Sequence, residues 1–218
     1  MPIHSAILRV VHGLNAIAVL GLISSGWAIY NAAPFLPFTF PVSISLGGYL
    51  TEALRWHFML VWLFIITTTL FIVLRLSPLS PYYGPSLFPI SYKAIQRDLV
   101  QALTFKLKHK LGQYNHIQRF LYVTVLLSFS VLFLSGFGLW KPVQLQPFNH
   151  IVGGYESMRR VHFGAMAVIA SFSVIHLIMV LLVPKTLLSM LFGLQNNATQ
   201  VKSPDIDSLL LKSRENEY

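Results

Sequence analysis

Four of the eight histidines lie inside long apolar segments of the chain: His12, His57, His162 and His176. Ionisable side chains are rare and costly within a membrane, so their presence there indicates a function. Any one of these imidazoles could instead be neutral and bonded to a backbone carbonyl. Four together, in segments whose cores contain no Asp, Glu, Lys or Arg, favour a role as ligands.

The spacing of the histidines predicts two pairs at different depths. His162 and His176 are fourteen residues apart, which on an α-helix is within about 40° of the same face and about 21 Å further along. His57 lies near the start of its segment, as His162 does, and His12 lies at the depth of His176. We therefore expect His57 to meet His162 in the outer leaflet and His12 to meet His176 in the inner leaflet.

Two imidazoles in a pair predict haem rather than another metal. Neutral imidazole ligates haem iron, and an iron with both axial positions filled favours electron transfer. Zinc commonly takes four ligands, and each pair offers only two nitrogens. The chain has no cysteine, which excludes thiolate sites and covalent haem attachment. We predict two haems b; a haem-free membrane anchor or transporter is the non-redox alternative.

The composition is that of a membrane protein. Hydrophobic residues make up 55% of the chain and charged residues 11%, against roughly 25% charged in soluble domains. Four segments are long enough for the about 20 helical residues that a bilayer core requires: 7–30, 54–74, 118–140 and 160–183. The predicted fold is all-α, a transmembrane four-helix bundle over residues 1–190 with a polar cytoplasmic tail at 191–218.

The basic residues predict the orientation of the bundle. Seven of the sixteen Lys and Arg residues fall within 75–119, whereas 31–51 contains none. The positive-inside rule places the basic connection and both termini in the cytoplasm. The net charge of +9 is therefore interpreted as a topology signal and a contact for anionic lipid headgroups, not as a nucleic-acid site.

The connections between the segments differ in character. In the basic connection, apolar residues recur every four positions, which predicts an amphipathic helix on the cytoplasmic interface; they are Ile95, Leu99, Leu103 and Leu107. A solvated charged helix is the alternative. The connection 31–51 contains three prolines among three phenylalanines, which predicts an irregular apolar surface outside the membrane.

Two short stretches of sequence are repeated. Residues 25–30 (SGWAIY) resemble 135–140 (SGFGLW), and 55–58 (RWHF) resemble 160–163 (RVHF). The repeats are compatible with a duplicated helix pair, although common membrane-boundary chemistry could also produce them. Four glycines could let a porphyrin or a neighbouring helix approach closely: Gly13, Gly26, Gly136 and Gly164.

Arginines flank the proposed outer ligands. Arg55 and Arg160 each stand two residues before a proposed ligand, so we expect both to pair with haem propionates. Arg159 is a third cation at this edge. Ordinary snorkelling to the membrane interface is the alternative for each of them.

The histidine pattern resembles that of the bacterial di-haem cytochrome b family, which includes the formate dehydrogenase gamma subunit, the b-type cytochrome of nickel–iron hydrogenase and the thiosulfate reductase cytochrome b subunit. The resemblance covers about residues 1–190 and implies the same ligand pairing. Residues 114–118 (YNHIQ) are similar to the family's Tyr-Asn-x-x-Gln stretch, which implies that Asn115 and Gln118 bind quinone. The alternative for Asn115 is a helix N-cap. His109 and His116 lie nearby and could carry protons.

The chain carries no signature of a catalytic module. The resemblance therefore implies an electron-carrying subunit in the bacterial inner membrane, with quinone as co-substrate and a separate periplasmic oxidoreductase partner. That partner would dock on the outer side, for which the connection 31–51 is a candidate surface. The alternative is a stand-alone cytochrome b that oxidises a small outer substrate, such as superoxide, and reduces quinone itself.

Overall fold

The computed structural model describes residues 6–76, 91–103 and 116–182, and most of these residues are helical. In chain order the elements are α1 (Ala6–Ala32), the 3-10 helix η1 (Val42–Ile44), α2 (Leu50–Leu76), α3 (Tyr92–Leu103), α4 (His116–Trp140), α5 (Gln146–Val152) and α6 (Tyr155–Leu182). Four helices, α1, α2, α4 and α6, are long and apolar enough to cross a membrane. This confirms the predicted all-α fold with four spans. The proposed tail at 191–218 lies outside the described residues.

Two of the helices begin earlier than the apolar pattern indicates. Helix α2 starts at Leu50 rather than at 54, and α6 starts at Tyr155 rather than at 160. Each added turn contains a glutamate, Glu52 or Glu156, and acidic residues favour the first turn because they complement the helix dipole. Hydropathy marks the part of a helix that needs lipid, whereas the helix itself continues into the polar boundary.

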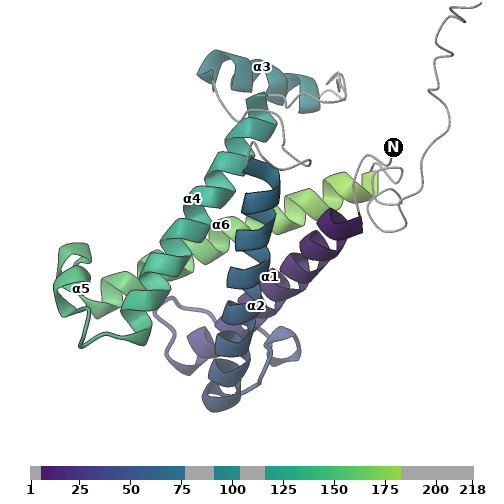
Figure 1. The fold of residues 1–218 in the computed structure, drawn as a ribbon. Coiled ribbons are helices and arrows are strands. Elements are labelled where there is room, and N and C mark those ends of the chain that lie inside the picture. The colour runs from purple at the N-terminus through teal and green to yellow at the C-terminus, as the bar shows by residue number, and fades with distance from the viewer. Residues whose placement is uncertain (1–5, 77–90, 104–115, 183–218) are drawn as a thin grey trace, which may run out of the picture.

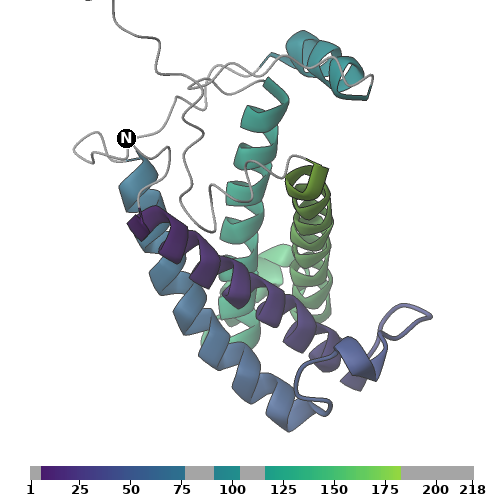
Figure 2. The same ribbon diagram turned by 90° about the vertical axis from the view of Figure 1, so that its right-hand side faces the viewer.

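The long helices form two close pairs. Backbone contacts concentrate between α1 and α2 and between α4 and α6, and the two pairs lie side by side (Figures 1 and 2). At Gly21 of α1 an added Cβ would lie only 2.6 Å from Cδ1 of Leu60 on α2, so the side chain of Leu60 packs directly on this glycine. Further along, Nδ2 of Asn15 donates a hydrogen bond of 2.9 Å to Oγ1 of Thr68.

The bundle has two distinct ends, which we call the α3 end and the α5 end. The α3 end contains the starts of α1 and α4, and α3 lies across the start of α4 (Figure 1). Asp98 of α3 is buried, and its Oδ2 accepts a 2.9 Å hydrogen bond from the backbone N–H of His116. The predicted helix in the basic connection is thus present over 92–103; Leu107 lies outside the described residues.

The α5 end carries a short helix that the sequence pattern did not reveal. Helix α5 begins with a proline near its N-terminus and ends at Gly153, whose φ of 99° is left-handed. Nδ2 of Asn149 donates to the carbonyl of Gly138 at 3.2 Å, which ties α5 to the end of α4. Residues 141–159 lie between two predicted spans, and the sequence pattern indicated no helix among them. Local capping and a buried amide define the structure there without any apolar run.

The connection 33–49 packs against the end of α1 through aromatic rings. The ring of Tyr30 lies 5.0 Å from that of Phe163 on α6 and 5.5 Å from that of Phe40. The Tyr30 hydroxyl donates to the carbonyl of Phe38 at 3.0 Å, and Asn31 exchanges two 2.9 Å hydrogen bonds with the backbone of Phe40. Apart from η1 the connection has no regular structure, as predicted, but it is firmly attached to α1 and α6.

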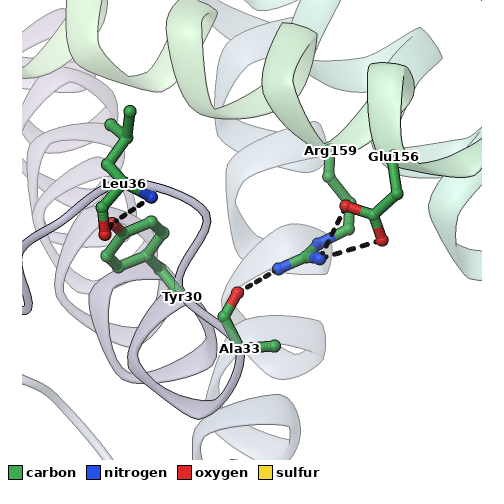
Figure 3. A network of polar contacts seen from close by, with 5 residues as sticks. All are labelled: Tyr30, Ala33, Leu36, Glu156 and Arg159. Atoms are coloured by element: carbon green, nitrogen blue, oxygen red, sulfur yellow. Dashed lines mark hydrogen bonds and ion pairs between the residues drawn. The ribbon is translucent and has the colours of Figure 1, made fainter.

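An arginine links this connection to α6. Arg159 forms an ion pair of 2.9 Å with Glu156 and donates to the carbonyl of Ala33, so that its guanidinium lies between the two (Figure 3). Figure 3 also shows Tyr30 with the backbone of Leu36, close to this contact. Only 22% of the Arg159 side chain is exposed. Arg159 therefore holds the end of α1 against the start of α6.

Candidate functional site

At the α5 end the structure brings His57 and His162 together. His57 is the eighth residue of α2 and His162 the eighth of α6, so both rings lie at the same depth. Their ring centres are 6.5 Å apart. Nδ1 of His57 is 2.9 Å from Oγ of Ser25, and Nδ1 of His162 is 2.9 Å from Oγ of Ser135.

At the α3 end the structure brings His12 and His176 together. His12 comes from the start of α1 and His176 from the end of α6, and their ring centres are 6.2 Å apart. The ring of His176 also stacks on Phe172, with 5.6 Å between centres and 20° between planes. The two pairings expected from depth and helical phase are therefore the ones that the fold assembles.

The separation of the rings within each pair fits an iron between two imidazoles. A metal lies about 2 Å from an imidazole nitrogen and the ring centre about 1.2 Å further, so two axial ligands on opposite sides of the metal have centres about 6.4 Å apart. The observed values are 6.2 and 6.5 Å. Among the described residues no group of three or more His, Cys, Asp or Glu side chains could hold a metal ion. The chemistry of two-nitrogen sites suits haem better than zinc.

Four glycines lie near the histidines: two of them border open space, and two lie against an imidazole ring. An added Cβ at Gly13 or Gly164 would meet nothing within 4 Å, so there is open space beside both glycines. Gly13 directly follows His12, and Gly164 lies two residues after His162. An added Cβ at Gly26 would lie 3.9 Å from Cε1 of His57, and one at Gly136 would lie 3.2 Å from Cε1 of His162. The first two glycines are compatible with a flat macrocycle beside the helix, and the last two make room for the imidazoles.

The arginines near the α5-end pair have different partners. Arg55 forms an ion pair with Glu52, and 72% of its side chain is exposed. Arg160 is exposed, whereas Arg159 is committed to Glu156 and Ala33. Pairing of Arg55 and Arg160 with haem propionates stays a prediction, and Arg55 would have to exchange Glu52 for that partner.

Of the two proposed quinone residues, the structure describes Gln118, which lies at the α3 end. Gln118 is partly buried in the first turn of α4. Asn115 and His109 lie outside the described residues, so both the quinone role and the N-cap alternative for Asn115 stay predictions. The ring of His116 has its Nδ1 buried without a hydrogen-bond partner among the residues that the structure describes.

Three residues near the histidines were missed in the sequence. Ser25 and Ser135 contact the α5-end imidazoles, and the repeated Ser-Gly pair at 25–26 and 135–136 was the signal that could have identified them. Arg9 lies one helical turn before His12, and its Nε is buried with no hydrogen-bond partner among the described side chains and backbone. Nothing in the apolar pattern distinguishes Arg9 from an interfacial anchor.

Comparison with known proteins agrees with this geometry. The family model described as prokaryotic cytochrome b561 matches residues 3–193. A relative, the putative protein-methionine-sulfoxide reductase subunit YedZ1 of Azospira oryzae, is 43% identical over 192 residues, covering 88% of this chain and 96% of the relative. No solved structure matches the chain. The resemblance to bacterial b-type cytochromes is thereby confirmed: the chain belongs to the prokaryotic cytochrome b561 family and is an integral membrane haem protein that transfers electrons.

Proposed function

We propose that this chain is the membrane subunit of a two-part oxidoreductase, and that it moves electrons between quinone and a periplasmic partner through two haems b. The proposed axial ligands are His57 with His162 and His12 with His176. The observation that carries the proposal is the ring-centre separation of 6.5 and 6.2 Å, which suits an iron between two imidazoles at both ends of the bundle.

The two sites share helix α6, which sets their separation. His162 and His176 are about 21 Å apart along that helix at a rise of about 1.5 Å per residue. Haem, when bound, supplies a one-electron carrier at each of these depths. Helices α1, α2 and α6 supply the ligands. The apolar composition of all four spans keeps water away from the sites.

The name of the relative supports a separate catalytic partner. YedZ1 is named as a subunit of a protein-methionine-sulfoxide reductase. By analogy we propose that this chain passes electrons from quinol to a periplasmic subunit that reduces methionine sulfoxide in proteins. A relative that is itself a subunit favours this reading over a stand-alone cytochrome that oxidises superoxide.

The orientation follows the basic residues. The positive-inside rule places the α3 end and both termini in the cytoplasm and the α5 end in the periplasm of a bacterial inner membrane. In that orientation His57 and His162 hold the outer haem, near the partner. Asn115 and Gln118 then lie on the cytoplasmic side, where we propose that quinol binds and releases its protons.

The ligand assignment is tested by removing one histidine from each pair. We expect the purified wild-type chain to contain two haems, and His57→Ala and His176→Ala to retain one haem each, with different reduced-minus-oxidised spectra. The double variant should contain none. His150→Ala is the matched control, because His150 is exposed on α5 and should leave both haems in place.

Two results would contradict the assignment. Full haem content in His57→Ala or His176→Ala would show that the substituted residue is not a ligand. Loss of the same haem in both variants would show that the pairing is wrong. The partner is tested separately: quinol-dependent reduction of methionine sulfoxide by membranes should need a second, periplasmic protein, whereas superoxide oxidation by the isolated chain would favour the alternative.

A further inference from the structure

The serine–histidine contact at the α5 end occurs twice, with the same internal geometry. Oγ of Ser25 donates to the carbonyl of Gly21 at 2.8 Å, and Oγ of Ser135 donates to the carbonyl of Val131 at 2.6 Å. In each case the acceptor is four residues earlier on the same helix. Both serines are buried, at 0% and 2% exposure, so no solvent competes for these hydroxyl groups.

This use of the hydroxyl proton decides the direction of the serine–histidine bond. A serine hydroxyl has one proton, and here the helix carbonyl receives it. The oxygen can then only accept from the imidazole, so Nδ1 of His57 and of His162 must carry the hydrogen. The carbonyls of Leu22 and Leu132 also lie 3.2 and 3.4 Å from the hydroxyls of Ser25 and Ser135, so each hydroxyl proton has a second acceptor on its own helix.

We propose that Ser25 and Ser135 are positioning residues for the outer haem: they hold Nδ1–H of His57 and His162 and so leave Nε2 of each ring free to bind iron. This inference rests on the proposed function, because it takes these two histidines as ligands. The serines act through the histidines and do not themselves touch the cofactor. Hydrogen-bond partners of this kind fix the tautomer and orientation of a ligating imidazole and raise its basicity.

A more basic imidazole stabilises the oxidised iron more than the reduced iron. Each serine should therefore lower the potential of the outer haem, and removal of either should raise it. The α3-end pair provides an internal comparison, since His176 lies about 21 Å along α6 from His162, the partner of Ser135. The inner haem should thus be insensitive to both serines.

The test is a redox titration of four variants that each contain both haems. Ser25→Ala and Ser135→Ala should shift the outer haem toward its reduced form, by up to about tenfold in the reduced-to-oxidised ratio at fixed ambient potential, because one neutral hydrogen bond is lost. Tenfold corresponds to 59 mV for one electron. Ser25→Thr and Ser135→Thr keep the hydroxyl and should titrate like the wild type.

Ser130→Ala is the matched control. Ser130 is on α4 with Ser135 and donates to the carbonyl of Leu126 at 3.0 Å, but it is exposed. Its replacement should change neither potential, because it removes the same kind of helix hydrogen bond without a histidine partner. An equal shift in this variant, or in the inner haem of any variant, would overturn the inference.

The remaining outcomes distinguish failure of the serine role from failure of the proposed function. Unchanged outer potentials in both alanine variants would overturn the positioning role while leaving two haems, and hence the proposed function, in place. Loss of the outer haem in an alanine variant but not in the matching threonine variant would support the role of the hydroxyl. Loss in both would assign the effect to packing and overturn the inference. A wild-type chain without two haems would instead refute the proposed function itself.

Discussion

Gly136→Ala should damage the α5-end site, whereas Gly26→Ala, at the equivalent place in the repeat, should not. A Cβ at 136 would lie 3.2 Å from Cε1 of His162 and 3.6 Å from its Nδ1, whereas a Cβ at 26 would lie 3.9 Å from Cε1 of His57. Because carbon atoms pack best at about 3.5–4.0 Å, His162 must retreat by about 0.3 Å and His57 need not move.

The displacement of the His162 ring would lengthen its hydrogen bond to Ser135. Nδ1 of His162 is 2.9 Å from Oγ of Ser135, and a further 0.3 Å brings the pair to about 3.2 Å, the upper end of the usual range. Overpacking of this kind costs about 1–3 kcal/mol. Each substitution also gains about 1 kcal/mol of helix propensity. We therefore expect Gly136→Ala to lose up to about 2 kcal/mol and Gly26→Ala to be neutral or stabilising.

The assay is retention of haem by the purified variants in the presence of a haem scavenger, followed by difference spectra. Gly136→Ala should release the α5-end haem faster than the wild type and retain the α3-end haem normally. Gly26→Ala should behave as the wild type. Equal behaviour of the two variants would refute the reasoning, since it rests on the different distances of the added carbons from their imidazoles.

Three further predictions concern the framework that positions the sites and are measured by unfolding in mixed micelles. Gly138→Ala should cost about 1–3 kcal/mol, because the added Cβ would lie 2.6 Å from Oδ1 of Asn149; retention of wild-type stability would contradict this. Asn15→Leu should cost about 0.6 kcal/mol, the average for hydrogen bonds between membrane helices, by removing the bond to Thr68, and Thr68→Val should add nothing to it. Gly47→Ala should destabilise the turn before α2, because φ there is 94° and alanine adopts it only with strain; an unchanged unfolding midpoint would argue against that strain.

The pairing of the histidines could be predicted from sequence because it depends only on helical period and depth. His162 and His176 lie on the same face of α6 however that helix is rotated. Each of them then needs only a second histidine at the same distance from the membrane boundary. Neither condition requires knowledge of how the helices cross. The same independence explains why the four spans were found from hydropathy alone.

The contacts at the α5 end could not be predicted in this way. Arg159 was expected to be a haem partner or an interfacial anchor. Instead it forms an ion pair with Glu156 and donates to the carbonyl of Ala33, which lies 126 residues earlier in the chain. Helix α5 has no apolar run, and its attachment depends on one buried amide, that of Asn149. Such contacts follow from three-dimensional proximity, which neither periodicity nor composition encodes.

The internal repeat accounts for one of the two sites and not for the other. At the α5 end, Ser25 and His57 of the first pair of helices match Ser135 and His162 of the second, so a twofold arrangement generates the whole site. The same offsets, 110 residues between the serines and 105 between the histidines, place Tyr122 opposite His12 and Phe71 opposite His176.

The α3-end pair therefore takes its two ligands from non-equivalent positions, the start of α1 and the end of α6. A symmetric duplication would have placed a second histidine at the position equivalent to each of them. The two sites consequently differ in their surroundings: serine hydroxyls contact both imidazoles of one, and the ring of Phe172 stacks on an imidazole of the other. The two proposed haems would therefore lie in different environments, and we expect them to have different potentials.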